Sequence, residues 1–159
     1  MNNDWKKISD SVWKHIDNNW QIKLDDNSWD RWFIHENGLN IYCGCLSDSF
    51  ESAIDIVSED LEPLNNDELQ IGSDGLLINA TPDMSMWKQN GNEGDEFFWW
   101  KSNGIRVTLE SDGLWHFYCE DLEFANVYDE ATFETLEKAL IYGHMNVSEY
   151  IANGWADSY

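Results

Sequence analysis

Side chains that commonly catalyse reactions or bind metals are few in this chain, and none lies in a recognised motif. The candidates are four histidines and three cysteines: His15, His35, His116, His144, Cys43, Cys45 and Cys119. His116 and Cys119 come closest to a base and thiol pair, but residues three apart on one strand point to opposite faces. The chain has no phosphate-binding glycine loop, Gly-x-Ser-x-Gly turn or complete calcium loop. We therefore expect a protein that is not an enzyme and uses neither a metal nor another cofactor.

Acidic residues, in contrast, are abundant and unevenly placed. The 159 residues include 31 acids against nine Lys and Arg, a formal net charge of −22. Residues 32–87 contain eleven acids and no base, and residues 107–159 contain eleven acids and one base. Such charge informs about partners and solubility rather than about the fold. Two base-poor blocks predict an acidic surface for a basic partner.

The first block contains a predicted helix from Asp48 to Glu62 with its charges on one side. Asp48 and Glu51 form a capping-box pattern, apolar residues recur at helical spacing, and Pro63 ends the segment. Its exposed stripe consists of Glu51, Asp55, Glu59 and Glu62. Like charges at this spacing destabilise a helix by about 0.2–0.5 kcal/mol per pair, and no base offsets them. Over about 21 Å, its six acids approximate the roughly six phosphates of one DNA strand.

A second acidic row is expected from the C-terminal block. The predicted partner-binding residues are therefore Asp48, Glu51, Asp55, Glu59, Asp60 and Glu62 from the first block, and Glu120, Asp121, Glu123, Asp129, Glu130, Glu134 and Glu137 from the second. Two alternatives to a binding surface are a generally over-charged, solvated surface and adaptation to high salt. The wealth of Trp, Phe, Ile and Asn argues against the second alternative.

Apolar periodicity predicts the elements of the N-terminal half. Helical spacing predicts a first helix, ending near residues 18–21, from Trp5, Ile8, Val12, Trp13, Ile16 and Trp20. From Trp29 the period changes to two, and Asn37-Gly38 predicts a hairpin between residues 31–35 and 39–43. A small hairpin is expected from residues 69–71 and 76–78.

The C-terminal half is predicted as a meander followed by helices. Its strands are expected at 96–101, 105–110 and 114–119, with turns at Asn103-Gly104 and Asp112-Gly113 and a fourth strand at 122–128. A helix from Phe133 should end at Gly143, and a short final helix should start at Asn146.

Together these elements predict an α+β fold with a mainly antiparallel sheet. The sheet would combine a hairpin with a three- or four-stranded meander, packed with an N-terminal, a middle and one or two C-terminal helices. The length predicts one domain, residues 1–159. A weak similarity between Leu39–Cys43 and Trp115–Cys119 suggests two related strand-helix halves, 29–62 and 96–143.

Ten tryptophans add to the expected core. Trp5, Trp13, Trp20 and Trp32 occupy periodic positions and are predicted to be buried. The run from Phe97 to Trp100 sends aromatic rings to both faces of a strand, so a central strand, a homodimer or a partner must cover it. We expect three of these four rings in the core and leave Trp100 open.

Partners and location follow from what the chain lacks. Nine dispersed bases cannot build the basic groove that direct nucleic-acid binding requires. No apolar N-terminal segment or run of about 20 apolar residues predicts export or a membrane span. The odd number of cysteines, in no metal-binding spacing, indicates reduced thiols and thus a cytoplasmic protein.

In its charge layout the chain resembles the DNA-mimic inhibitors that phages and mobile elements use against restriction or CRISPR defence, although no motif identifies a family. This resemblance implies a small protein that occludes the basic nucleic-acid site of a partner protein. The alternative is an immunity protein that neutralises a cationic toxin or nuclease. Both predict fast, salt-sensitive association.

Overall fold

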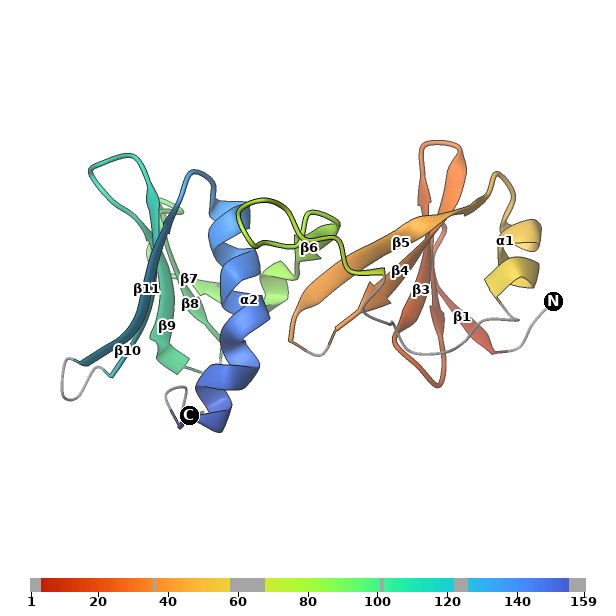
Figure 1. Cartoon of the computed structure of the whole chain (residues 1–159). Coiled ribbons are helices and arrows are strands. Elements are labelled where there is room, and N and C mark those ends of the chain that lie inside the picture. The colour runs from red at the N-terminus through yellow and green to blue at the C-terminus, as the bar shows by residue number, and fades with distance from the viewer. Residues whose placement is uncertain (1–3, 36, 58–67, 101, 122–125, 155–159) are drawn as a thin grey trace. The chain divides into compact units, whose positions relative to one another are not determined.

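The computed structural model describes residues 4–35, 37–57, 68–100, 102–121 and 126–154 (Figure 1). The chain divides into two compact units: unit 1 contains residues 1–36 and 40–80, and unit 2 contains residues 37–39 and 81–159. One domain with two similar halves, 29–62 and 96–143, stays a prediction.

The predicted fold class is wrong. The described residues form eleven strands, in antiparallel sheets of six and five, and only two α-helices. Three or four helices packed on one hairpin and a meander are therefore not what this chain forms. The error arises mainly in the N-terminal segment, where strands replace the expected helix.

Unit 1 is an antiparallel meander with one helix. Its strands follow one another in the sheet in chain order, with a short sixth strand next to the fifth. The elements are β1 (Trp5–Ser9), β2 (Val12–His15), β3 (Trp20–Asp25), β4 (Ser28–Ile34), β5 (Leu39–Ser47) and α1 (Phe50–Val57). The sixth strand of the sheet is β6 (Ala80–Pro82), of which only Ala80 belongs to unit 1. The expected Asn37-Gly38 hairpin is confirmed between β4 and β5, with Gly38 at φ 94°. A bridge between Ile71 and Leu77 confirms the small hairpin.

Turn chemistry explains why no N-terminal helix forms. Ser9-Asp10-Ser11 and Asp17-Asn18-Asn19 interrupt the apolar pattern with residues that favour turns, and the Trp, Val and Ile between them favour strands. The second turn is held by the backbone N–H of Trp20, which donates to the side chain of Asn18 at 3.0 Å. Ile8 and Ile16, expected inside, are 56% and 57% exposed.

Indole rings and α1 together form the core of unit 1. Ala53, Ile54 and Val57 pack against a cluster that contains Trp5, Trp20, Ile22 and Trp29, with Trp13 and Phe50 at its border. Burial of Trp5 and Trp20 is thus confirmed. Trp32 differs from the expectation, because it is only partly buried and alternates with Phe33, which packs on the core.

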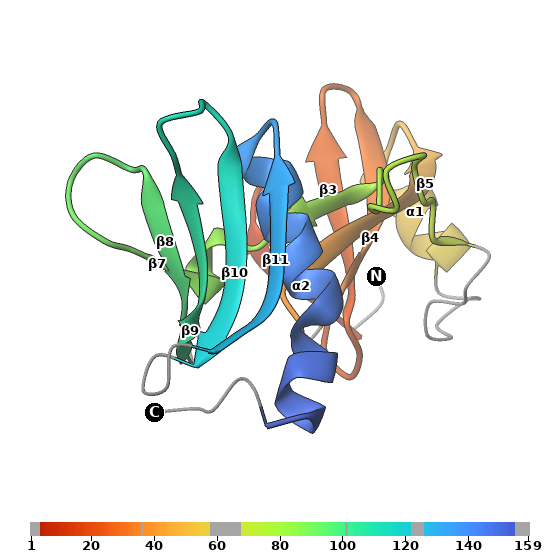
Figure 2. The same cartoon turned by 60° about the vertical axis from the view of Figure 1, so that its left-hand side comes forward.

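Unit 2 is a second meander, with one long helix along one face of its sheet (Figure 2). The strand order is β11-β10-β9-β8-β7, so every strand neighbours the next one in the chain. The elements are a 3-10 turn (Met84–Met86), β7 (Trp87–Gln89), β8 (Glu96–Trp99), β9 (Ser102–Leu109), β10 (Trp115–Asp121), β11 (Asn126–Phe133) and α2 (Leu136–Ala152).

The core of unit 2 lies between α2 and the sheet. Phe97 and Trp99 belong to it as expected, together with Phe117 and Leu140. Phe98, the third ring expected inside, is only partly buried, since alternation turns it to the other face, and Trp100 is exposed.

Two glycines were wrongly interpreted as ends of elements. Gly104 lies inside β9, where a Cβ atom would stand 2.4 Å from the backbone oxygen of Glu120. Gly143 lies inside α2, where a Cβ atom would stand 3.0 Å from the ring of Phe117. Both glycines permit close packing, so the turn at 103–104 and the separate final helix are wrong. The fourth strand, expected at 122–128, is β11 at 126–133.

Replacing Gly104 by Ala is expected to destabilise the protein by about 1–3 kcal/mol, because β9 and β10 must move apart to admit the methyl group. Urea denaturation followed by tryptophan fluorescence measures this loss. The control is Ser111→Ala, at an exposed position after β9, which should change stability by less than about 0.5 kcal/mol. Equal stability of the two variants would contradict the packing role of Gly104.

Candidate partner-binding surface

The helix α1 presents acids as predicted, but over a shorter described length. Ala53, Ile54 and Val57 face the core, while Glu51 and Asp55, one helical turn apart, are exposed. Asp48 is exposed just before the helix. Glu59, Asp60 and Glu62 lie outside the described residues, as do Leu61 and Pro63.

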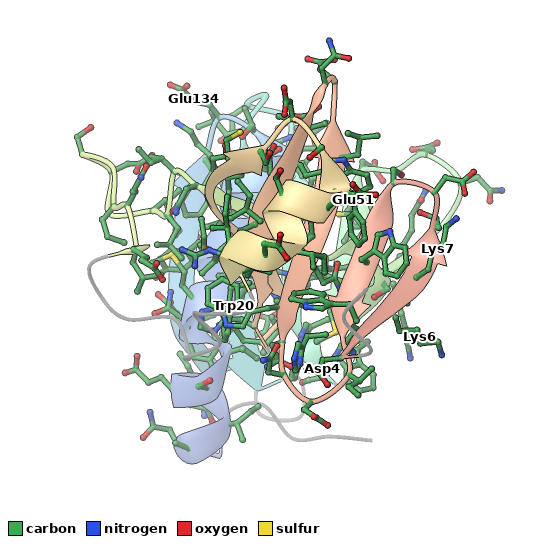
Figure 3. The ribbon with its side chains drawn as sticks, turned by 90° about the vertical axis from the view of Figure 1, so that its right-hand side faces the viewer. Asp4, Lys6, Lys7, Trp20, Glu51 and Glu134 are labelled. Carbon is green, nitrogen blue, oxygen red and sulfur yellow. The ribbon has the colours of Figure 1, made fainter. Side chains whose placement is uncertain are left out.

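The helix is capped one residue later than the capping box predicts. The Ser49 hydroxyl accepts a hydrogen bond from the backbone N–H of Ser52 at 3.3 Å, which satisfies one of the free donors of the first turn. Asp48 is therefore not needed as a cap, and its carboxylate is available to solvent together with Glu51 and Asp55. We call these three residues the α1 acidic patch; Figure 3 shows Glu51 on the outer side of α1.

Two residues of the predicted second row are committed to contacts inside unit 2. Glu120 forms an ion pair with Arg106, with Oε1 2.8 Å from Nη2 and 2.9 Å from Nε. Asp129 accepts hydrogen bonds from the hydroxyl groups of Tyr142 at 2.7 Å and Tyr150 at 2.5 Å. Burial and this bond raise the pKa of Tyr142 to about 12, so both tyrosines remain donors. Neither carboxylate is free to contact a partner.

The other acids of the second row divide into exposed residues and residues that lie outside the description. Glu130, Glu134 and Glu137 are exposed. Glu134 and Glu137, at the start of α2, we call the α2 acidic patch, whereas Glu130 follows Asp129 on β11 and therefore points to the face of the sheet away from α2. Glu137 lies in the first turn of α2, where the helix dipole favours an anion, so it also stabilises the helix. Glu123 and the side chain of Asp121 lie outside the described part of the chain.

Within the described part of the chain, no carboxylate of either patch forms an ion pair. Among the residues that the structure describes, ion pairs join Lys7, Arg31, Arg106 and His116 to acids that belong to neither patch. The carboxylates of both patches are thus solvated charges that attract a basic surface over about 8 Å at physiological salt.

Burial disfavours the thiolate form of two of the three cysteines. Cys119 lies in the core, where burial raises the pKa of its thiol to about 12, and burial raises that of Cys43 to about 11. His116 instead contacts Asp112 at 2.8 Å on the opposite face of β10, which confirms that His116 and Cys119 diverge. In the described ranges no three His, Cys, Asp or Glu side chains gather as metal ligands.

His144 is a buried polar residue that residue spacing did not single out. Its Nε2 accepts a hydrogen bond from the indole N–H of Trp87 at 2.8 Å, and its Nδ1 contacts the backbone oxygen of Asn37. Nothing in the sequence around His144 signals this contact, because its partners are 57 and 107 residues away.

Comparisons with known proteins identify no relative. No family model matches the chain, and no curated protein or solved structure matches it significantly. Within the described residues, neither helix is long and apolar enough to span a membrane.

Proposed function

We propose that this protein binds a basic partner protein through the α1 acidic patch and presents its carboxylates in place of nucleic-acid phosphates. The observation that carries this proposal is the pair Glu51 and Asp55, exposed on one side of a helix and without an ion pair in the described structure. The other side of α1 is locked in the core, so the carboxylates are held by a rigid element.

Occlusion of the partner's site is the proposed mechanism. Acidic side chains would pair with the partner's lysines and arginines that otherwise bind phosphates. Complementary charge would also speed the association of the two proteins. The α2 acidic patch supplies a second group of exposed carboxylates for the same kind of contact. An inhibitor of restriction or CRISPR defence is the class that this mechanism suits best.

An immunity protein that neutralises a cationic nuclease remains the second candidate, because it needs the same exposed carboxylates. The identity of the partner separates the two. A co-purified defence protein supports the first function, whereas a toxin encoded beside this chain supports the second.

Reversing two charges tests the α1 acidic patch. The variant Glu51→Lys, Asp55→Lys is expected to weaken partner binding at least about tenfold, because two attractive contacts become repulsive. Affinity is measured by calorimetry with the partner that the wild-type protein captures from host lysate, over a range of salt concentrations.

The matched control is Glu93→Lys, Glu149→Lys, which makes the same change in net charge at two exposed positions outside both patches. It should reduce affinity much less. Equal loss in both variants would mean that only net charge matters, and a partner without a basic nucleic-acid site would refute the mimicry.

A further inference from the structure

A continuous row of side chains crosses the unit 1 sheet on the face opposite α1. Strand pairing places five residues side by side on β1 to β5: Lys6, Lys14, Gln21, Trp32 and Tyr42. Their chain neighbours, among them Trp5, Trp13 and Phe33, pack towards α1, so alternation turns these five away from it. We call them the outer row.

Two lysines face each other at one end of the outer row. Lys6 and Lys14 are direct cross-strand partners, both are exposed, and no ion pair within the described structure involves either of them. Like charges directly opposite on a sheet are destabilising. Lys7, on the other face of β1, is paired with Asp10 at 3.0 Å.

Protection of a sheet edge does not account for this pair. Lysines on edge strands commonly prevent edge-to-edge aggregation, which suffices for Lys6 on β1. Lys14 lies on β2, which is paired on both sides. In the equivalent row of unit 2, the central Arg106 is neutralised by Glu96 and Glu120, so this acid-rich chain does supply counter-ions elsewhere.

The other end of the outer row is an aromatic platform. Trp32 and Tyr42 are partly exposed and meet edge to face, with ring centroids 5.4 Å apart. The Nζ atom of Lys23 lies 4.7 Å from the centroid of Trp32 and adds a positive charge beside the indole. Gln21 stands between the two ends with an amide that both donates and accepts.

We propose that the outer row binds a short acidic peptide segment of a partner protein in extended conformation. Two carboxylates would pair with Lys6 and Lys14, and an aromatic or aliphatic side chain would pack on Trp32 and Tyr42. Four strand spacings of about 4.8 Å give a row of about 19 Å, the length of roughly six extended residues. This surface is separate from the α1 acidic patch, since the two lie on opposite faces of one sheet.

Charge favours a peptide over a nucleic acid as the occupant. The chain carries a net −22, which repels a ligand in proportion to the ligand's own charge. A six-nucleotide segment brings about six negative charges, whereas the peptide needs only the two that Lys6 and Lys14 neutralise. Aromatic packing then supplies attraction that does not depend on charge.

The probe is an acetylated, amidated hexapeptide, Glu-Gly-Glu-Gly-Gly-Phe, titrated into the isotopically labelled full chain by NMR at low ionic strength. We expect amide chemical-shift changes concentrated on β1 to β5. The variant Lys6→Glu, Lys14→Glu should lower the affinity for the peptide at least about tenfold. Trp32→Ala should also lower the affinity for the peptide, but it should leave the salt dependence of that affinity unchanged. If the double reversal fails to fold, Lys6→Gln, Lys14→Gln, which removes two charges instead of reversing them, is compared with Lys7→Gln, Lys138→Gln.

Controls separate this surface from general charge and from the proposed function. Lys7→Glu, Lys138→Glu makes the same change in net charge at two exposed positions off the outer row and should bind the peptide nearly as the wild type does. Glu51→Lys, Asp55→Lys should leave the shifts on β1 to β5 in place, whatever it does to the basic partner. Absence of shifts there, or tighter binding of hexathymidylate than of the peptide through the same lysines, would overturn the proposal.

Discussion

Acidification from pH 7 to pH 4 is expected to lower the free energy of unfolding by about 3 kcal/mol through His144 alone. His144 is fully buried, and its Nε2 must stay unprotonated to accept the indole N–H of Trp87. Burial is the main cause that lowers the pKa of His144 to about 4 from 6.5.

The sign of this pH effect on stability follows from proton binding by His144 in the folded and unfolded states. Above pH 6.5 the imidazole is neutral in both states and has no effect. Between pH 6.5 and pH 4 the unfolded chain binds a proton that the folded protein does not, so stability falls as the pH falls, and below pH 4 the loss is complete. His35, whose pKa is also lowered by burial, acts in the same direction.

The test is urea denaturation of the wild type and of His144→Gln at successive pH values. The difference between the two proteins separates the effect of His144 from the titration of the many carboxylates. The variant should be less stable at pH 7, and its stability should decrease less steeply between pH 6.5 and pH 4. His116→Gln is the control, because His116 is partly exposed and lies beside Asp112. Parallel pH profiles for the wild type and His144→Gln would contradict the assignment.

Replacing Asp129 by Ala is expected to cost about 3 kcal/mol of stability, because two tyrosine hydroxyls lose a charged acceptor. Tyr150 is only 2% exposed, so water cannot easily replace the carboxylate. Its burial and the same bond raise the pKa of Tyr150 well above its ordinary value. This contact links β11 to α2.

Glu130→Ala is the matched control, since Glu130 is adjacent, exposed and equally charged. It should change stability by less than about 0.5 kcal/mol. A double-mutant cycle of Asp129→Ala with Tyr150→Phe, measured by denaturation, should reveal a favourable coupling. If the two single acidic variants were equally stable, Asp129 would be an ordinary surface acid.

Local patterns predicted those elements whose residues form their own contacts. Asn-Gly between two alternating runs specifies the hairpin of β4 and β5, since the turn needs only its own residues. The stripe of Ala53, Ile54 and Val57 specifies α1 in the same way. The predicted N-terminal helix was wrong because aromatic residues at helical intervals also fit two short strands separated by turns.

The roles of glycines and acids were harder to predict from the sequence, because these roles depend on residues that are distant in the chain. Gly104 looks like a turn residue, yet it lies in a strand that must approach Glu120 closely. Asp129 and Glu130 are adjacent and chemically alike, but only Asp129 meets two tyrosines. Of the seven acids in the predicted second row, three are exposed and two support the interior of unit 2, while the side chains of the other two lie outside the description.

The sequence by itself determined that this chain is acidic, aromatic, free of recognised catalytic motifs and able to form an acidic helix within residues 48–62. These properties depend on composition and on residues within a few positions of one another. Only the tertiary structure decided which carboxylates remain exposed, which lysines stand together on the outer row, and that His144 is buried. The reason is physical: burial and pairing depend on residues brought together across the sheet, such as Asn37 and His144, which are 107 positions apart.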